Sequence, residues 1–289
     1  MQLTKRQHFV PNFYLLQWAR DGSQVASHDL QEARSFMVST EKVLNQRYYY
    51  EENREDPDNR IEKMLSRMEG QWAPHFSRFA SIDLGSATSL SVVKTVQAAT
   101  TIFTEEAATA IKTFAAFQYL RVPGAVAQKR FELGAISNDD GAIDEALNPG
   151  RFVESGYDYL NERFQSMKLL IQISTTQDFL TSDWPCFDAK QSADAPVIGQ
   201  EIGVNPEVVA YVPLTPRIGA IMFPPSHLPD AHRMPTVHIS TATDADVRNL
   251  NTLVIQQSER FVVARDEQSF IFKVAKKRKK GIHKSMHEN

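Results

Sequence analysis

Cysteine is almost absent from this chain. The 289 residues include one cysteine, Cys186, so no disulfide can form within the chain. A chain of this length buries enough apolar surface to hold a core without disulfides. Sparse cysteine is typical of reducing compartments, and we therefore expect a cytoplasmic protein.

Long apolar runs are absent as well. The longest apolar-rich stretch, residues 107–120, is interrupted by polar side chains such as Lys112 and Gln118. About 18 consecutive apolar residues are needed to cross a bilayer. Residues 1–8 are polar and basic, unlike a secretory signal. We expect neither a membrane span nor a membrane partner.

The familiar catalytic signatures are also missing. The sequence has no glycine-rich phosphate loop, no His-Glu-x-x-His pair and no Cys-x-x-Cys. His227, His232 and His238 lie in a proline-rich segment at spacings of five and six, which is weak spacing for metal ligands and more typical of a surface loop. These absences leave the reaction and the cofactor open, a divalent metal included.

Positive charge is present but unevenly distributed. The net charge is −3, although seven cations lie within residues 273–284. Setting those seven aside changes −3 to −10 for the remaining chain, so an acidic body precedes a basic, flexible tail over residues 276–289. Such a tail favours an anionic partner, and a solvated tail that aids solubility is the alternative. The residues we expect to contact nucleic acid are Lys276, Lys277, Arg278, Lys279 and Lys280.

Hydrophobic periodicity predicts an α+β fold in a single domain, residues 1–275. We expect a central helical region packed with a mostly antiparallel sheet from the N- and C-terminal regions. Predicted helices cover residues 11–18, 61–79, 105–120, 157–167 and 244–260. Predicted strands cover residues 23–30, 34–39, 169–174, 178–181, 208–213, 218–223, 261–265 and 269–274.

Three polar residues fall on faces that are otherwise apolar. Asn251 lies on the predicted helix 244–260, one turn after Val247, and Gln118 with Arg121 continues the apolar face of helix 105–120. A buried amide without a hydrogen bond costs about 1–3 kcal/mol, so each needs a structural or a ligand partner. Arg121 suits a helix C-terminus, and it equally suits a carboxylate or phosphate ligand.

Two charged residues end strands. Phe179, Thr181 and Asp183 share one face of a predicted strand, and Asp183 is a candidate general base or metal ligand, or else a turn cap. Arg217 lies in the turn between two apolar strands. It either pairs with Asp183 as scaffolding or joins Arg121 in clamping an anionic substrate.

The N-terminal segment carries the strongest local pattern. His8 precedes the first predicted helix and has basic neighbours, including Lys5. A histidine that titrates near neutrality can act as general acid or base, and a structural histidine is the alternative. We take His8, Asp183 and Arg217 as candidate catalytic residues. The candidate substrate-binding residues are Lys5, Gln118, Arg121 and Asn251.

Five motifs follow one another along the chain. They are Lys5-x-x-His8-x-Val10-Pro11-x-x-Tyr14-Leu15, Gln118-x-x-Arg121-x-Pro123, Phe179-Leu-Thr-Ser-Asp183-x-Pro185, Pro213-Leu-Thr-Pro-Arg217 and Leu250-Asn251 followed by Phe261-Val-Val. In this order they resemble the family known as domain of unknown function 4238, over about residues 4–265. The resemblance implies a mostly bacterial intracellular protein without an agreed activity. The chain departs from the family pattern at Gln7, where a histidine often precedes His8, and at Trp184, where asparagine is common.

Two functions fit these residues. The first is a hydrolase, a nuclease or phosphoesterase of bacterial defence or a toxin, in which His8 and Asp183 perform acid–base chemistry or bind metal and Arg121 and Arg217 hold a phosphate. The second is a non-catalytic module that binds nucleic acid or a protein. The two differ in whether these side chains converge in one cleft.

Overall fold

The computed structural model describes residues 4–82, 89–134, 141, 143, 146–189, 209–227 and 235–266. Several predictions of the sequence lie outside these residues: the basic tail with Lys276–Lys280, the strand at 269–274, and His232. Within the described ranges, no helix combines the length and apolarity that crossing a bilayer requires.

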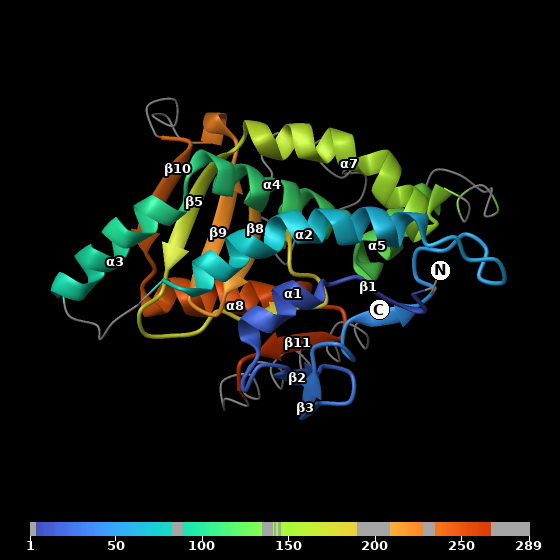
Figure 1. The fold of residues 1–289 in the computed structure, drawn as a ribbon, viewed down its shortest axis with the longest axis horizontal. Coiled ribbons are helices and arrows are strands. Elements are labelled where there is room, and N and C mark those ends of the chain that lie inside the picture. Colours follow the sequence, from blue (N-terminus) through green and yellow to red (C-terminus); the bar gives the residue numbers. More distant parts are fainter. Residues whose placement is uncertain are drawn as a thin grey trace, which may run out of the picture.

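Helices form most of the middle of the chain (Figure 1). The predicted helix at 105–120 is confirmed at both ends, and the predicted stripe from Ile61 to Phe79 lies within one long helix. The helices are α1 (Asn12–Leu15), followed directly by the 3-10 turn η1 (Leu16–Trp18), α2 (Arg60–Ala80), α3 (Ser89–Ile102), α4 (Glu105–Leu120), α5 (Pro123–Gly134), α7 (Pro149–Ser166), the 3-10 turn η2 (Pro225–His227) and α8 (Asp244–Gln257).

The strands form three sheets. The five-stranded sheet has the order β10-β5-β9-β8-β7 and is antiparallel except for the β10–β5 pair. The four-stranded sheet has the order β3-β2-β11-β6 and is antiparallel throughout. Strands β1 and β4 form a separate antiparallel ribbon. The strands are β1 (Arg6–His8), β2 (Gln24–Asp29), β3 (Arg34–Ser39), β4 (Asn45–Arg47), β5 (Lys168–Ile173), β6 (Thr181–Ser182), β7 (Phe187–Asp188), β8 (Ala210–Thr215), β9 (Ile218–Phe223), β10 (Val237–Thr241) and β11 (Phe261–Ala264).

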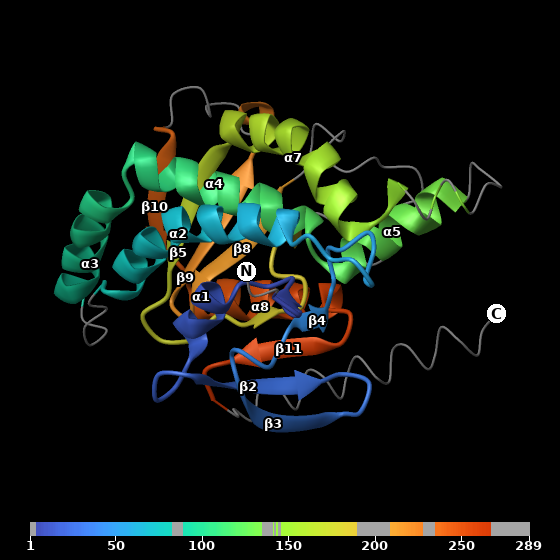
Figure 2. The ribbon, with the colours of Figure 1, turned by 45° about the vertical axis from the view of Figure 1, so that its right-hand side comes forward.

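The helices and sheets are arranged in layers. In both Figure 1 and Figure 2, α2, α4 and α7 lie on one side, the four-stranded sheet lies at the opposite end, and α8 runs between them. The N-terminal strands β2 and β3 share a sheet with the C-terminal strand β11, so the two ends of the described chain meet. The α+β fold predicted from the sequence is confirmed, with three sheets in place of one.

An aromatic cluster fills the space beneath α2 and α4. The Phe114 ring centroid lies 5.2 Å from that of Tyr14, 5.6 Å from Trp72 and 4.8 Å from Phe76. Offset and edge-on aromatic pairs of this kind contribute about 0.5–1.5 kcal/mol beyond burial. The cluster therefore fixes α1, α2 and α4 relative to one another.

Polar contacts connect α1 to both large sheets. The Tyr14 hydroxyl donates to Pro213 O at 2.8 Å and lies 2.7 Å from Thr181 Oγ1. Trp18 Nε1 donates to Phe179 O at 2.9 Å. Three segments that are remote in sequence, around residues 14, 180 and 213, thus meet in one buried place.

Three predicted boundaries are wrong for local reasons. Helix α7 begins at Pro149 rather than 157 because Asn148 accepts from two N–H groups of its first turn. The strand predicted at 178–181 is reduced to Thr181–Ser182, since Asn251 binds the preceding backbone. Helix α8 ends at Gln257 rather than 260 because Asp183 binds the following N–H groups.

Candidate functional site

Arg121 is the centre of a buried network at the C-terminus of α4. Its side chain is 1% exposed. It donates to three groups: Nε to the Tyr50 hydroxyl at 3.0 Å, Nη1 to Glu69 at 2.9 Å, and Nη2 to the carbonyl of His8 at 2.6 Å. All of these partners belong to the protein, so the guanidinium joins α4, α2 and the N-terminal strand.

Two glutamines hold the same segment. Gln118 is fully buried on α4 and donates from Nε2 to Phe9 O at 2.8 Å. Gln7 is fully buried as well; it donates to Glu51 at 2.6 Å and accepts from Tyr50 N at 2.8 Å. Gln118 therefore anchors the residues after strand β1 to α4, and Gln7 anchors the strand itself to the turn at Tyr50 and Glu51.

His8 lies at the edge of this network with its ring half-buried. Its Nε2–H donates to Thr40 O at 3.2 Å. Burial lowers the pKa of His8 below its usual 6.5, the charge of Arg121 lowers it further, and the Thr40 carbonyl opposes both. The imidazole is therefore neutral at pH 7. Lys5 precedes it on the exposed surface.

Asp183 binds main-chain donors rather than another predicted site residue. Its carboxylate is 7% exposed and accepts from the N–H groups of Glu259 at 3.0 Å, Arg260 at 2.7 Å and Phe261 at 2.8 Å. Burial raises the pKa of Asp183 to about 6, and the three N–H donors act against that rise. The carboxylate thus fixes the turn from α8 into β11.

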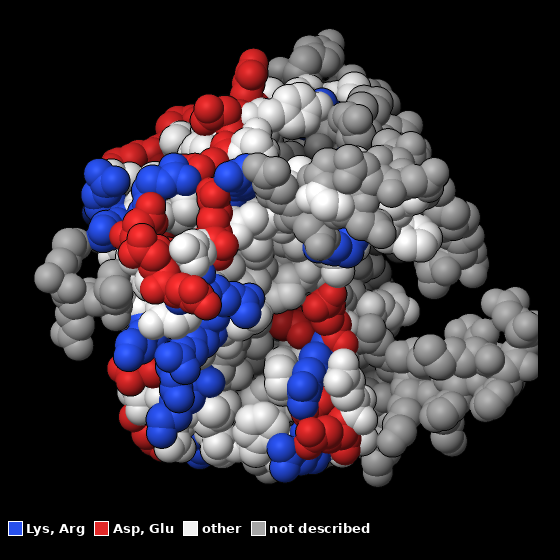
Figure 3. Space-filling model, turned by 90° about the vertical axis from the view of Figure 1, so that its right-hand side faces the viewer, with Lys and Arg blue, Asp and Glu red and all other residues white. Residues whose placement is uncertain are grey.

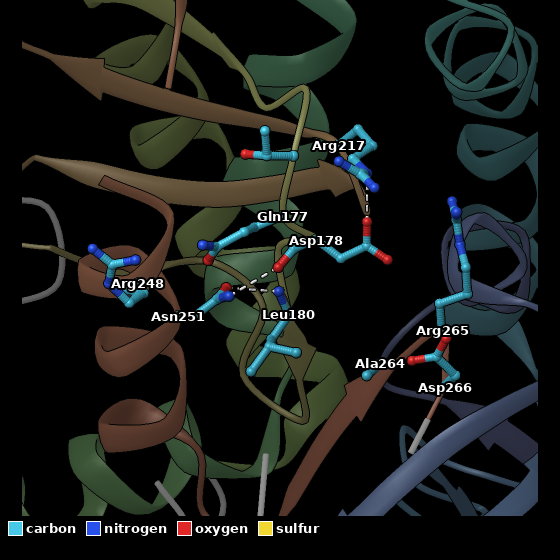
Figure 4. Close-up of a pocket in the computed structure, with 10 residues that line it drawn as sticks. Gln177, Asp178, Leu180, Arg217, Arg248, Asn251, Ala264, Arg265 and Asp266 are labelled. Carbon is cyan, nitrogen blue, oxygen red and sulfur yellow. Dashed lines mark hydrogen bonds and ion pairs between the residues drawn. The ribbon is translucent and has the colours of Figure 1, made fainter. Parts of the chain in front are cut away.

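Arg217 and Asn251 are the two predicted site residues that share a pocket. The pocket has a volume of about 290 Å³ and lies between the turn after β8, the segment before β6, helix α8 and the end of β11 (Figure 4). Asn251 accepts from Leu180 N at 2.8 Å and donates to Asp178 O at 2.9 Å. The residues lining it are Thr176, Gln177, Asp178, Leu180, Arg217, Arg248, Asn251, Ala264, Arg265 and Asp266.

Three arginines and two aspartates, Asp178 and Asp266, line this pocket, so its charged side chains have a net charge of +1. Arg217 Nε lies 2.5 Å from Asp178 Oδ1, while Arg217 Nη1 is buried and has no hydrogen-bond partner among the described residues. The guanidinium groups of Arg248 and Arg265 form no ion pair with any residue that the structure describes. A buried donor without a partner is unfavourable, so this wall is suited to an anion.

The predicted site is therefore divided. Gln118 and Arg121 bind the backbone beside His8, Asp183 binds the turn before β11, and Arg217 with Asn251 lines the pocket. The pairing of Arg217 with Asp183 considered from sequence does not occur, since Arg217 pairs with Asp178. His8 and Asp183 have different partners: His8 binds Thr40 O, whereas Asp183 binds the N–H groups that follow α8.

Arg248 and Arg265 were missed from the sequence. Arg248 has a usable signal, because it precedes Asn251 by three positions and so shares a face of α8 with it. Arg265 has no such signal, since only the pairing of β11 with β2 and β6 brings it to the pocket. In the described part of the chain, no three His, Cys, Asp or Glu side chains are grouped as metal ligands.

Comparison with known families places these motifs in context. The family model described as "Protein of unknown function (DUF4238)" matches residues 6–168 and 136–268, which together span most of the chain. The resemblance stated from the motifs is thereby confirmed. No curated protein and no solved structure matches the chain.

Proposed function

The chain belongs to the family described as Protein of unknown function (DUF4238), whose description assigns no reaction, and we propose that it binds a small phosphate-bearing ligand in the pocket around Arg217. One observation carries this proposal: three arginines, Arg217, Arg248 and Arg265, are among the residues that line one cavity, and of these three only Arg217 is ion-paired within the described chain. Guanidinium groups match phosphate oxygens in both charge and geometry.

The size and polarity of the cavity limit the ligand. About 290 Å³ lies just below the usual range for small-molecule sites, roughly 300–1,000 Å³. A nucleoside monophosphate, a sugar phosphate or the terminal nucleotide of a strand has this scale. Gln177 and Thr176 supply neutral hydrogen-bonding groups, and Asp266 supplies a buried Oδ1 that lacks a partner among the described residues. Hydroxyl donors of a sugar would satisfy that oxygen.

Hydrolysis of such a ligand, as a nuclease or phosphoesterase of bacterial defence or a toxin, stays a prediction. His8 and Asp183 make their recorded contacts away from the pocket lining, so the geometry favours phosphate binding over the acid–base pair expected from sequence. The hypothesis that His8 and Asp183 catalyse hydrolysis can be tested directly. The protein and its His8→Ala and Asp183→Ala variants are incubated with RNA and with DNA in the presence of divalent metal. Cleavage that neither substitution reduces would reject those residues as catalytic.

The binding proposal is tested by calorimetric titration with nucleoside monophosphates, ribose 5-phosphate and inorganic phosphate. Arg248→Gln with Arg265→Gln is the informative variant, because neither side chain forms an ion pair in the described fold. Hydrogen bonds to charged groups contribute about 1.5–3 kcal/mol each, so affinity should fall at least tenfold.

Arg78→Gln is the matched control. Arg78 is an exposed arginine of α2 that lines a separate groove between α2 and α4, and its loss should leave affinity unchanged. Equal affinity in the double variant and in the unmodified protein, or equal losses in the double variant and the control, would contradict the assignment of this pocket.

A further inference from the structure

The β1–β4 ribbon presents one polar face to the outside. Its register pairs Arg6 with Arg47, Gln7 with Gln46 and His8 with Asn45. Side chains alternate along a strand, and Gln7 is fully buried. The opposite face of the ribbon therefore carries Arg6, His8, Arg47 and Asn45.

Four cations lie on this face or in the segments that adjoin the ribbon in the chain, and we name them the ribbon patch: Lys5, Arg6, Lys42 and Arg47. All four are exposed, and none forms an ion pair within the ranges that the structure describes. Some other surface arginines are ion-paired, as in the pairs Arg151–Glu52 at 2.7 Å and Arg260–Asp29 at 2.7 Å. Figure 3 shows Lys and Arg side chains clustered at this end of the molecule, below a group of Asp and Glu.

The arrangement within the patch is unfavourable for the isolated protein. Arg6 and Arg47 are direct cross-strand partners, and like charges placed directly opposite destabilise a sheet. An anion lying across the ribbon would interact with both guanidinium groups at once and remove that repulsion. The body of the chain is otherwise acidic, so this patch is a local exception to its charge.

An aromatic ring adjoins the patch. The Arg47 guanidinium lies over the Tyr48 ring, 5.2 Å from its centroid, and Tyr48 is half-buried. Planar guanidinium groups and aromatic rings are the surfaces on which unpaired nucleobases stack. The exposed large apolar side chains of the described fold, Leu16, Met37, Phe131 and Tyr159, belong to other elements, which argues against insertion of this ribbon into a lipid surface.

We propose that the ribbon patch binds the phosphodiester backbone of single-stranded nucleic acid. Lys5, Arg6, Lys42 and Arg47 contact successive phosphates, and the Arg47–Tyr48 stack receives a base. This surface is separate from the pocket around Arg217 and adds a polyanion contact to the small-ligand site proposed there. It is also separate from the basic tail, whose predicted role in nucleic-acid binding it does not require.

Fluorescence anisotropy with labelled 20-nucleotide poly(U) RNA and poly(dT) DNA, titrated at several KCl concentrations, measures this contact on the full chain. For single strands the logarithm of the affinity falls with the logarithm of salt by about 0.7 per neutralised phosphate. The double variant Arg6→Gln, Arg47→Gln should therefore lower affinity at least fivefold and reduce the magnitude of the salt slope by about 1.4.

Three further proteins separate the possible sources of binding. A variant with glutamine at the five cations of residues 276–280 measures the contribution of the tail to oligonucleotide affinity. Adding Arg6→Gln and Arg47→Gln to this tail variant should still lower its affinity at least fivefold. Arg78→Gln should leave affinity and slope unchanged. Arg248→Gln with Arg265→Gln should also leave oligonucleotide binding unchanged, so failure of the pocket proposal would be distinguishable from failure of this one.

Several outcomes would overturn the inference. One is an unchanged salt slope in the ribbon variant; another is the absence of oligonucleotide binding by the unmodified protein. Vesicles of phosphatidylcholine with phosphatidylserine provide the membrane comparison. Binding to these vesicles without binding to either oligonucleotide would assign the patch to an anionic lipid surface instead.

Discussion

At the scale of single residues, three of the buried polar side chains bind main-chain groups. Gln118 binds the backbone of Phe9, Asn251 binds the backbone on either side of Phe179, and Asp183 binds three consecutive N–H groups. Each satisfies main-chain groups of a segment that lacks regular strand pairing there. Because an unpaired buried main-chain group costs free energy comparable to a lost hydrogen bond, these side chains stabilise irregular segments that would otherwise be unfavourable.

Substitution of Arg121 tests whether a buried polar side chain of this kind stabilises the fold. Arg121→Met removes the donor to Glu69, Tyr50 and the His8 carbonyl and leaves all three without it. Breaking a buried ion pair by removing one partner costs about 3–5 kcal/mol, so the free energy of unfolding in urea should fall by about that amount. The control Arg78→Met, at an exposed position of α2, should change it by less than about 0.5 kcal/mol. A loss for Arg121→Met no larger than the control's would mean that Arg121 is not structural.

At the scale of elements, α2 contributes carboxylates as well as apolar contacts to the network around Arg121. Glu69 pairs with Arg121 at 2.9 Å. Glu62 lies two turns earlier, and burial, together with the charges of Glu69 and Glu51, raises its pKa to about 7, although Arg121 opposes the rise. One cation thus faces several carboxylates, which makes the stability of this layer depend on pH.

The direction of this pH dependence follows from the pKa of Glu62 in the folded and in the unfolded protein. The pKa of Glu62 is about 7 in the folded protein against 4.5 for the ordinary group, so its contribution to stability is complete below pH 4.5 and is lost as pH rises through 7. One pKa unit corresponds to about 1.4 kcal/mol, which sets an upper limit of roughly 3 kcal/mol. Glu62→Gln should remove this loss, so the variant's advantage over the unmodified protein grows between pH 5 and pH 8 in urea unfolding. Glu55→Gln, at an exposed position, should give a curve parallel to that of the unmodified protein; parallel curves for Glu62→Gln would contradict the assignment.

At the scale of the whole molecule, helix α1 and the turn η1 that follows it connect segments that are remote in sequence. The Tyr14 hydroxyl reaches Thr181 Oγ1 and Pro213 O, and the Trp18 indole reaches Phe179 O. Helix α1 lies between the helical layer and the two large sheets in these contacts, so the N-terminal segment is part of the core rather than an appendage.

Tyr14→Phe measures the energy of this junction. The substitution keeps the ring and leaves Thr181 and Pro213 without the hydroxyl, which should lower the free energy of unfolding by about 1–3 kcal/mol. The denaturant slope should stay constant and the transition single, since the three segments unfold together. Tyr211→Phe is the control, because the buried Tyr211 hydroxyl has no hydrogen-bond partner in the described fold; its removal should be neutral or stabilising. Equal losses in the two variants would contradict the role given to Tyr14.

Predictions from the sequence succeeded where a pattern repeats along one element. Helix α4, the stripe of α2 and the start of α8 at Asp244 were predictable because their signals lie within a few residues of one another. The burial of Gln118 and Asn251 was predictable for the same reason. Strands β1, β4 and β10 were not, because each is short and depends on a partner remote in the chain.

The sequence by itself determined the α+β class, the helical middle of the chain, the family and the burial of Gln118, Arg121 and Asn251. It did so through periodicity and motif order, which are local or linear properties. Only the tertiary structure decided what those residues bind. Gln118 and Asp183 bind main-chain groups, Arg121 binds two side chains and one carbonyl, and Arg217 lines a pocket. The physical reason is that a buried polar side chain requires a partner without specifying one, and which partner is near depends on how distant segments pack.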